Sequence, residues 1–180
     1  MKLLLSAGHN EQAQGAVNGE GFTEWVIATQ WVNLIQELID PIIPCAIVPS
    51  GTLNSKVKWI NQQPDVLVVV EIHFNSNVNA KGVEALYHPN SKAGARLAKH
   101  LTDGFEKRNL FMPNRGPKEG YYQMNPDKPV DFLLRKTNPI ACIFEPDFIS
   151  QKNRIIANKD IACNAIADIL IDYVDSEFGV

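Results

Sequence analysis

The chain has 180 residues, a usual length for one globular domain, so we expect a single domain over residues 1–180. Apolar residues make up 45% and charged residues 21% of the sequence, which is ordinary for a soluble protein. The formal net charge of −3 argues against a surface for nucleic acid or anionic membranes. Cys45, Cys142 and Cys163 are odd in number, widely spaced and set in apolar runs, so we interpret them as buried free thiols.

The first apolar run, Leu3–Leu5, is too short for the core of a signal peptide and predicts a strand instead. No stretch of the sequence approaches the length of a transmembrane helix. We therefore expect synthesis in the cytoplasm without a signal peptide, and no stable membrane association.

Short β-rich runs alternate with longer helical patterns along the chain. Residues 66–70 are a continuous run of β-branched and leucine residues, typical of a strand buried on both faces. Hydrophobic periodicity predicts strands at 3–5, 42–48, 66–70, 83–87 and 140–144, and helices at 24–39, 53–61, 92–108, 130–136 and 158–174. Pro44 within 42–48 favours a sheet edge, and Pro113, Gly116 and Pro117 predict a loop. This alternation indicates an α/β fold, a twisted and mostly parallel sheet with helices on both faces.

Polar residues stand where several of these strands end. His9 follows the first strand, His73 follows residues 66–70, and Glu145 follows residues 140–144, while Glu24 begins the first long helix. Ligands of open α/β sheets gather beyond the carboxyl ends of the strands. We therefore expect these four side chains to meet on one rim.

Each of these residues also has an ordinary interpretation. A histidine at a strand end is more often simply hydrogen-bonded, and a glutamate in the first turn of a helix is favoured by the helix dipole. Together, however, two imidazoles and a carboxylate form a zinc set that leaves one position open, and a further glutamate can act as a base. His88, which also follows a strand, is a weaker rival ligand, and Glu20 competes with Glu24.

Four motifs in order extend this pattern over nearly the whole chain. They are Ala7-Gly8-His9 with Gly15-Ala16, Gly19, Gly21 and Glu24; Ile72-His73-Phe74-Asn75-Ser76, followed by Lys81-Gly82-Val83-Glu84; Asn114-Arg115-Gly116 with Lys118; and Ile143-Phe144-Glu145 with Phe148-Ile149-Ser150. The chain thereby resembles the amidase-3 type of zinc-dependent N-acetylmuramoyl-L-alanine amidases, found among bacterial cell-wall hydrolases and phage endolysins.

The resemblance implies a function and a site. It implies Zn²⁺ held by His9, Glu24 and His73, with Glu145 as the catalytic glutamate, hydrolysing the amide bond between N-acetylmuramic acid and L-alanine of peptidoglycan. Asn75, Arg115 and Lys118 are then candidates to bind the substrate; for the two cations, ordinary solvated loop charges are an equal alternative.

Two departures from the family pattern lie beside this site. Glu71 stands where the family usually has a small residue, and alternation puts its side chain on the same side as His73, as a partner of that ligand or as a surface group. Pro146-Asp147 replaces the small residues that usually follow the catalytic glutamate.

Both the route by which the protein reaches the cell wall and the reaction that it catalyses have alternatives. With no cell-wall-binding module and no export signal apparent, we expect a phage or prophage endolysin released through a holin-type membrane hole, rather than a bacterial autolysin. The alternatives to an amidase are another zinc peptidase or carboxypeptidase acting on stem peptides, and a non-catalytic zinc domain that binds the wall.

Overall fold

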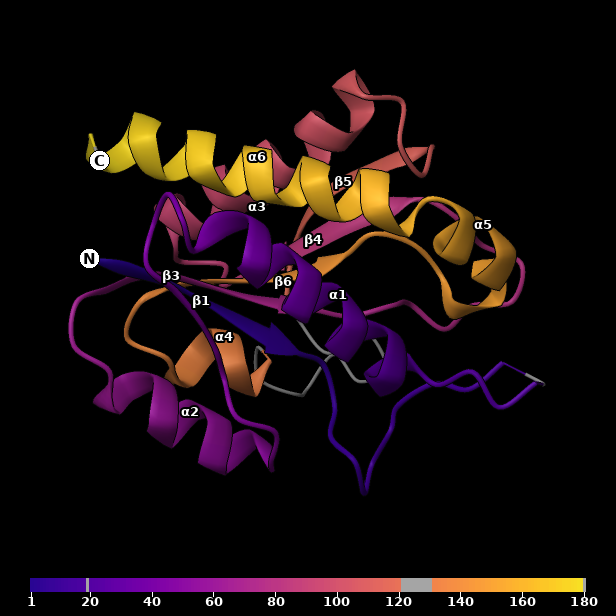
Figure 1. Cartoon of the computed structure of the whole chain (residues 1–180), viewed down its shortest axis with the longest axis horizontal. Helices are drawn as coiled ribbons and strands as arrows, with labels where there is room; N and C mark the ends of the chain where they lie inside the picture. Colours follow the sequence, from indigo (N-terminus) through magenta and orange to yellow (C-terminus); the bar gives the residue numbers. More distant parts are fainter. Residues whose placement is uncertain (19, 121–130, 180) are drawn as a thin grey trace.

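The structure is a computed structural model, and it describes residues 1–18, 20–120 and 131–179. Its centre is a six-stranded sheet in the order β2-β1-β3-β6-β4-β5 (Figure 1). The strands are β1 (Lys2–Ala7), β2 (Cys45–Ile47), β3 (Val66–Ile72), β4 (Val83–Tyr87), β5 (Asn114–Glu119) and β6 (Ile140–Glu145). Neighbouring strands pair in parallel except β4 and β6, which are antiparallel, so the expected mostly parallel sheet is confirmed.

Helices cover both faces of this sheet, as expected. They are α1 (Glu24–Ile39), α2 (Leu53–Gln62), α3 (Lys92–Lys107), α4 (Phe132–Lys136), α5 (Lys152–Ala157) and α6 (Lys159–Phe178), with a 3₁₀ turn at Ile149–Gln151. In Figure 1, α1, α3 and α6 lie on one side of the sheet, and α2 and α4 lie on the other. The described helices and strands thus form one layered unit.

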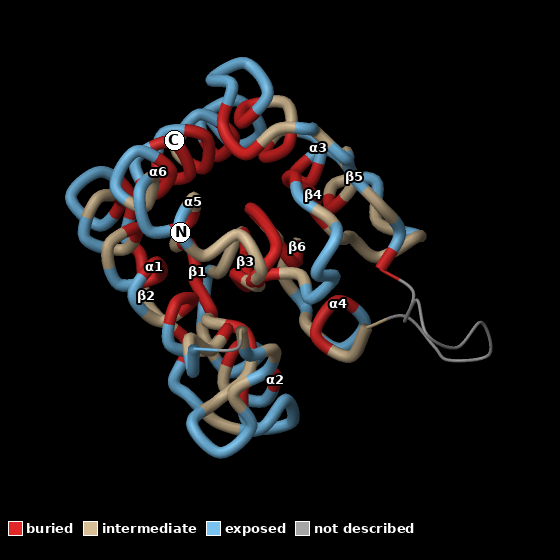
Figure 2. Tube along the Cα trace, turned by 90° about the vertical axis from the view of Figure 1, so that its right-hand side faces the viewer, coloured by how far each residue is buried: buried red, intermediate tan, exposed pale blue. Residues whose placement is uncertain are grey.

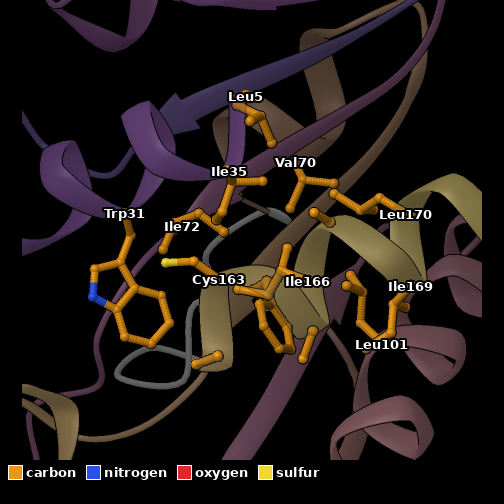
Figure 3. Close-up of a cluster of buried hydrophobic side chains, with 14 of the residues drawn as sticks. Leu5, Trp31, Ile35, Val70, Ile72, Leu101, Cys163, Ile166, Ile169 and Leu170 are labelled. Carbon is orange, nitrogen blue, oxygen red and sulfur yellow. The ribbon is translucent and has the colours of Figure 1, made fainter. Parts of the chain in front are cut away.

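Alternation along the buried strands supplies two hydrophobic cores, one for each face. Leu3 and Leu5 of β1 face the larger core, which they share with residues of α1, α3 and α6. Several members of this cluster, among them Trp31, Ile35 and Ile166, are drawn in Figure 3. Leu4 faces the smaller core beneath α2 and α4. Figure 2 shows the resulting pattern, with buried strands at the centre and exposed residues on the outer sides of the helices.

The prediction of a loop at Pro113, Gly116 and Pro117 was wrong for Gly116 and Pro117, because both lie in β5, which begins one residue after Pro113. Among the described strands, β5 lies at the edge of the sheet and pairs with β4. A proline lacks a backbone N–H, and an edge strand tolerates that loss on its unpaired side. Gly116 has a φ of +78° and lies beside a shift in the β4–β5 register, so the irregularity falls where glycine permits it.

The direction of β4 decides which of its ends reaches the predicted rim. Glu84 pairs with Glu145, and Tyr87 pairs with Cys142, so β4 begins where β6 ends. His88 therefore lies near the opposite end of the strands from Glu145. Its Nδ1 accepts a hydrogen bond from the backbone N–H of Asn90. It is not a member of the candidate ligand set.

The remaining sequence expectations concern the thiols and the membrane. All three cysteines are buried and free, as predicted. Burial raises the pKa of the Cys45 and Cys163 thiols to about 12, so both are protonated at neutral pH. Among the described residues, no helix combines the length and the apolar character needed to cross a membrane.

Candidate metal centre and acid–base site

The side chains of His9, Glu24 and His73 converge at one end of the sheet. Nε2 of His9 lies 2.9 Å from Oε2 of Glu24, and Nδ1 of His73 lies 2.8 Å from Oε1 of the same carboxylate. One ligand atom from each of the three residues falls within 4.8 Å of the others, a set able to hold a metal ion. Residues separated by 64 positions in the sequence thus form one cluster.

Local backbone structure positions each of these three side chains. Glu24 is the first residue of α1, and the Oγ1 of Thr23 accepts a hydrogen bond from the N–H of Val26 to cap that helix. His9 comes two residues after β1 and has a φ of +65°, uncommon for a residue with a side chain. His73 follows β3 directly, and its backbone N–H donates to the carbonyl of Phe144.

Two glycines leave the space that the ligands occupy. A Cβ on Gly15 would lie 2.4 Å from the His9 ring and 2.6 Å from Oε2 of Glu24, and the φ of Gly15 is +75°. A Cβ on Gly8 would lie 2.7 Å from the His73 ring. Both positions therefore require glycine for the three ligands to meet as they do.

The buried Glu24 carboxylate is held in its charged form. Burial alone would raise its pKa, but hydrogen bonds from His73 and His9 lower it well below the usual value. Backbone N–H groups of Ala16 and Phe74 also donate to its two oxygens. Burial likewise works against a charged His73, yet its hydrogen bonds to Glu24 and Glu71 raise the His73 pKa well above its usual value.

Glu145 shares a cavity of about 550 Å³ with the three ligands. It is the last residue of β6, and its Oε2 accepts a hydrogen bond of 2.8 Å from Nδ2 of Asn75. Asn75 also lines the cavity, and the same Nδ2 donates to Oε1 of Glu84 over 2.9 Å. The expected meeting of His9, Glu24, His73 and Glu145 on one rim is therefore observed.

Glu84 is a member of this site that sequence reasoning did not single out. It is buried at the start of β4, where Lys118 Nζ donates to its Oε2 over 2.7 Å and Arg115 Nε donates to the same oxygen. Arg115 and Lys118 thus direct their charges at Glu84. The Lys81-Gly82-Val83-Glu84 motif marked the position, but only the antiparallel pairing with β6 brings Glu84 opposite Glu145.

The neighbouring carboxyl groups of Glu84 and Glu145 have pKa values shifted in opposite directions. Burial would raise the pKa of Glu84, but Lys118 and Arg115 hold it below its usual value. Burial raises the pKa of Glu145 to about 8; the negative charge of Glu84 adds to this rise, while the positive charge of His73 opposes it. In the metal-free protein, Glu145 therefore holds a proton at neutral pH beside an ionised Glu84.

The two departures from the family pattern have different roles. Glu71 is buried, and its Oε1 lies 3.0 Å from Nε2 of His73, which favours the interpretation as a partner of that ligand. Asp147 is also fully buried, but it forms a bidentate ion pair with Arg154 and accepts a hydrogen bond from the N–H of Gly82. Glu20 is exposed and pairs with Lys152, so it is not part of the ligand cluster.

With this geometry established, comparison with known proteins identifies the family. The sequence profile of the N-acetylmuramoyl-L-alanine amidases of the amidase-3 type matches residues 3–168. The chain belongs to this family. A search among curated proteins returned no match.

Solved structures of amidases share the fold. An N-acetylmuramoyl-L-alanine amidase from Clostridium difficile 630 superposes with a TM-score of 0.83 at 19% identity, covering 98% of this chain and 97% of that chain. The amidase AmiC2 of Nostoc punctiforme gives 0.82 at 17% identity, with 97% of each chain covered. The catalytic domain of the CD27L endolysin, which targets Clostridia difficile, gives 0.74 at 22% identity, covering 98% of this chain and 97% of that domain.

The raised pKa of Glu145 predicts a pH-dependent stabilisation when this carboxyl group is removed. Because the pKa rises from 4.5 to about 8 on folding, the folded protein keeps a proton that the unfolded chain has released between these values. The contribution of Glu145 to stability therefore falls as the pH rises through this range. A Glu145→Gln substitution should raise the Tm of the metal-free protein at pH 8 and change it little at pH 5, as thermal unfolding at both values would measure.

A lower Tm of Glu145→Gln would instead identify Glu145 as a purely structural carboxylate. If Glu145 only fixed the end of β6, its replacement would lower the Tm at both pH values. A decrease at pH 8 would contradict the raised pKa.

Proposed function

We propose that this protein is a zinc-dependent amidase that hydrolyses the bond between N-acetylmuramic acid and L-alanine in peptidoglycan. The observation that carries the proposal is the shared cavity, in which the His9–Glu24–His73 cluster and the protonated Glu145 carboxyl lie together. Membership of the amidase family supports the substrate and the bond that is cut.

The ligand cluster fits zinc by its chemistry. Two imidazole nitrogens and one carboxylate oxygen are the protein ligands of many catalytic zinc sites, which keep a further position open. His9 and Glu24 approach each other through Nε2 and Oε2, and Gly15 leaves room for both side chains. When bound there, zinc would polarise the amide carbonyl and lower the pKa of a water molecule.

Glu145 would move the protons of the reaction. Its carboxylate form would take a proton from the attacking water, and its carboxylic acid form would pass a proton to the departing nitrogen of L-alanine. A pKa raised towards neutrality suits a group that must both accept and donate. Nδ2 of Asn75 donates to Oε2 of Glu145 and so orients the carboxyl group in the cavity.

The predicted substrate contacts of Asn75, Arg115 and Lys118 stay proposals. Asn75 lines the cavity and is therefore placed to reach a substrate. Arg115 and Lys118 both donate to Glu84, so a stem-peptide carboxylate would have to compete with that buried anion for them. We therefore favour Asn75 over the two cations as a direct contact.

For the biological setting, we propose a phage or prophage endolysin, supported by the likeness to an endolysin catalytic domain over 98% of this chain. Expressed in the cytoplasm of a host whose wall it cuts, the protein should lyse the cells only when a holin-type membrane hole is co-expressed. Turbidity with and without the hole measures this. Lysis without the hole would contradict release by this route.

The activity itself is tested by the products. Purified sacculi incubated with the protein should release material with new L-alanine amino termini, identified by mass spectrometry, and a zinc chelator should stop the release. Release of single C-terminal residues would instead identify a carboxypeptidase. Binding to sacculi without any cleavage would identify a wall-binding domain.

Two substitutions separate metal binding from proton transfer. His73→Ala should lose both zinc and turnover, because it removes a ligand. Glu145→Gln should retain one zinc per chain while the catalytic rate falls by roughly 10²–10⁴, the typical loss of general acid–base help. Elemental analysis and initial rates on sacculi measure the two effects, with Glu145→Gln as the folded control for His73→Ala. Loss of zinc from Glu145→Gln would show that Glu145 is itself a ligand.

A further inference from the structure

A buried polar cluster lies directly behind the His73 ring, on the side away from Glu24. Its centre is Glu71 in β3, which is 1% exposed. Oε1 of Glu71 lies 3.0 Å from Nε2 of His73, while Oε2 accepts hydrogen bonds from Ser6 Oγ at 2.6 Å and from Lys56 Nζ at 3.1 Å. Both oxygens of this carboxylate are therefore occupied by side chains of the protein.

Lys56 extends the cluster to the strand that carries the other histidine. It comes from α2, is 2% exposed, and its Nζ also donates to the carbonyl oxygen of Ala7, the last residue of β1. His9 follows that strand two residues later. One ammonium group thus joins the end of β1 to the Glu71 side chain, next to both predicted histidine ligands.

Stability is a poor explanation for this buried ion pair. Removing two charges from water carries a large desolvation cost, and apolar residues of similar size often replace such pairs without loss of stability. On the same face of the sheet, α2 contributes Ile60 to the smaller hydrophobic core, where an apolar pair could be accommodated. The position of the pair beside His73 therefore points to a role at the ligand.

The geometry around His73 shows what that role is. An imidazole can bind a metal through either nitrogen, and the hydrogen bond made by one nitrogen determines which is free. Nε2 of His73 faces Glu71, so Nδ1 is the nitrogen directed at Glu24 and the candidate metal position. The ring also packs against Gly8, which limits its rotation.

We propose that Glu71, held in place by Lys56 and Ser6, is a positioning residue that fixes the His73 ring with Nδ1 towards the metal. This inference rests on the zinc site proposed above. Because Lys56 also binds the end of β1, it maintains the spacing between the strand ends that carry His9 and His73. Glu71 itself is not one of the clustered ligands, since it contacts the Nε2 side of the His73 ring, away from Glu24.

The sharpest test replaces the buried pair by apolar residues in the double variant Lys56→Met/Glu71→Leu. If the pair positions His73, zinc affinity should fall by about 10–100-fold, the usual effect of losing such a partner. The Tm of the metal-free protein should stay near that of the parent, because the apolar replacements fill the same space. Chelator competition measures the zinc Kd, and thermal unfolding measures the Tm.

Two single variants, Glu71→Gln and the control Asp147→Asn, separate the loss of a partner of His73 from the loss of a buried charge elsewhere. Glu71→Gln keeps the shape of the side chain but removes its charge, so it should also weaken zinc binding, and it should alter the absorption spectrum of the cobalt-substituted protein. Asp147→Asn breaks another ion pair that has a fully buried carboxylate, to the partly exposed Arg154, and should lower the Tm without changing the zinc Kd.

The outcomes separate the inference from the function on which it rests. If the parent binds zinc and the folded Glu71 variants bind it within twofold of the parent, the positioning role is overturned while the amidase proposal stands. If Asp147→Asn weakens zinc binding as much as Glu71→Gln, the effect is general destabilisation and the role is again overturned. If the parent itself binds no zinc, the proposed function fails and the inference fails with it.

Discussion

The carboxylate of Glu24 is the constraint on which the site depends. It is a buried charge, and it is stable only because each oxygen has partners: His9 and the N–H of Ala16 at one, His73 and the N–H of Phe74 at the other. These groups come from the end of β1, the following loop and the end of β3, so satisfying one carboxylate brings three segments together. Helix α1 supplies the required rigidity, since Glu24 begins it and the apolar face of the helix packs into the larger core.

Glu84 and Glu145 show how one fold keeps two similar side chains in different protonation states. Glu84 and Glu145 lie opposite each other on paired strands and share the Asn75 amide. Arg115 and Lys118 stabilise the charge of Glu84, while burial and the charge of Glu84 hold Glu145 neutral against the opposing charge of His73. Neighbouring carboxyl groups whose environments push their pKa values apart are characteristic of acid–base sites.

The residues that the structure brings together share a simple signal in the sequence, since His9, His73 and Glu145 each stand at or just after the end of a buried strand and Glu24 begins an amphipathic helix. The prediction of parallel strands was enough to bring their ends together. Strand β5 could not be predicted, because Pro113 just before it and Pro117 within it obscure a strand that is permitted only by its place at the edge. The place of Glu84 opposite Glu145 depends on the pairing between β4 and β6, and its contacts with Arg115 and Lys118 depend on the pairing between β4 and β5. No local pattern reveals either register.

The antiparallel direction of β4 brings the start of one strand to the same rim as the ends of the parallel strands. In a fully parallel sheet, the end of β4 would lie on the active rim, and His88 would be a reasonable ligand. Because β4 runs antiparallel to β6, its beginning reaches the rim instead and places Glu84 against Glu145. Strand β5 runs parallel to β4 beside it, so Arg115 near its start and Lys118 near its end both reach Glu84 and keep it ionised. The direction of one strand thus sets both the ligand set, by excluding His88, and the protonation state of the proposed catalytic glutamate.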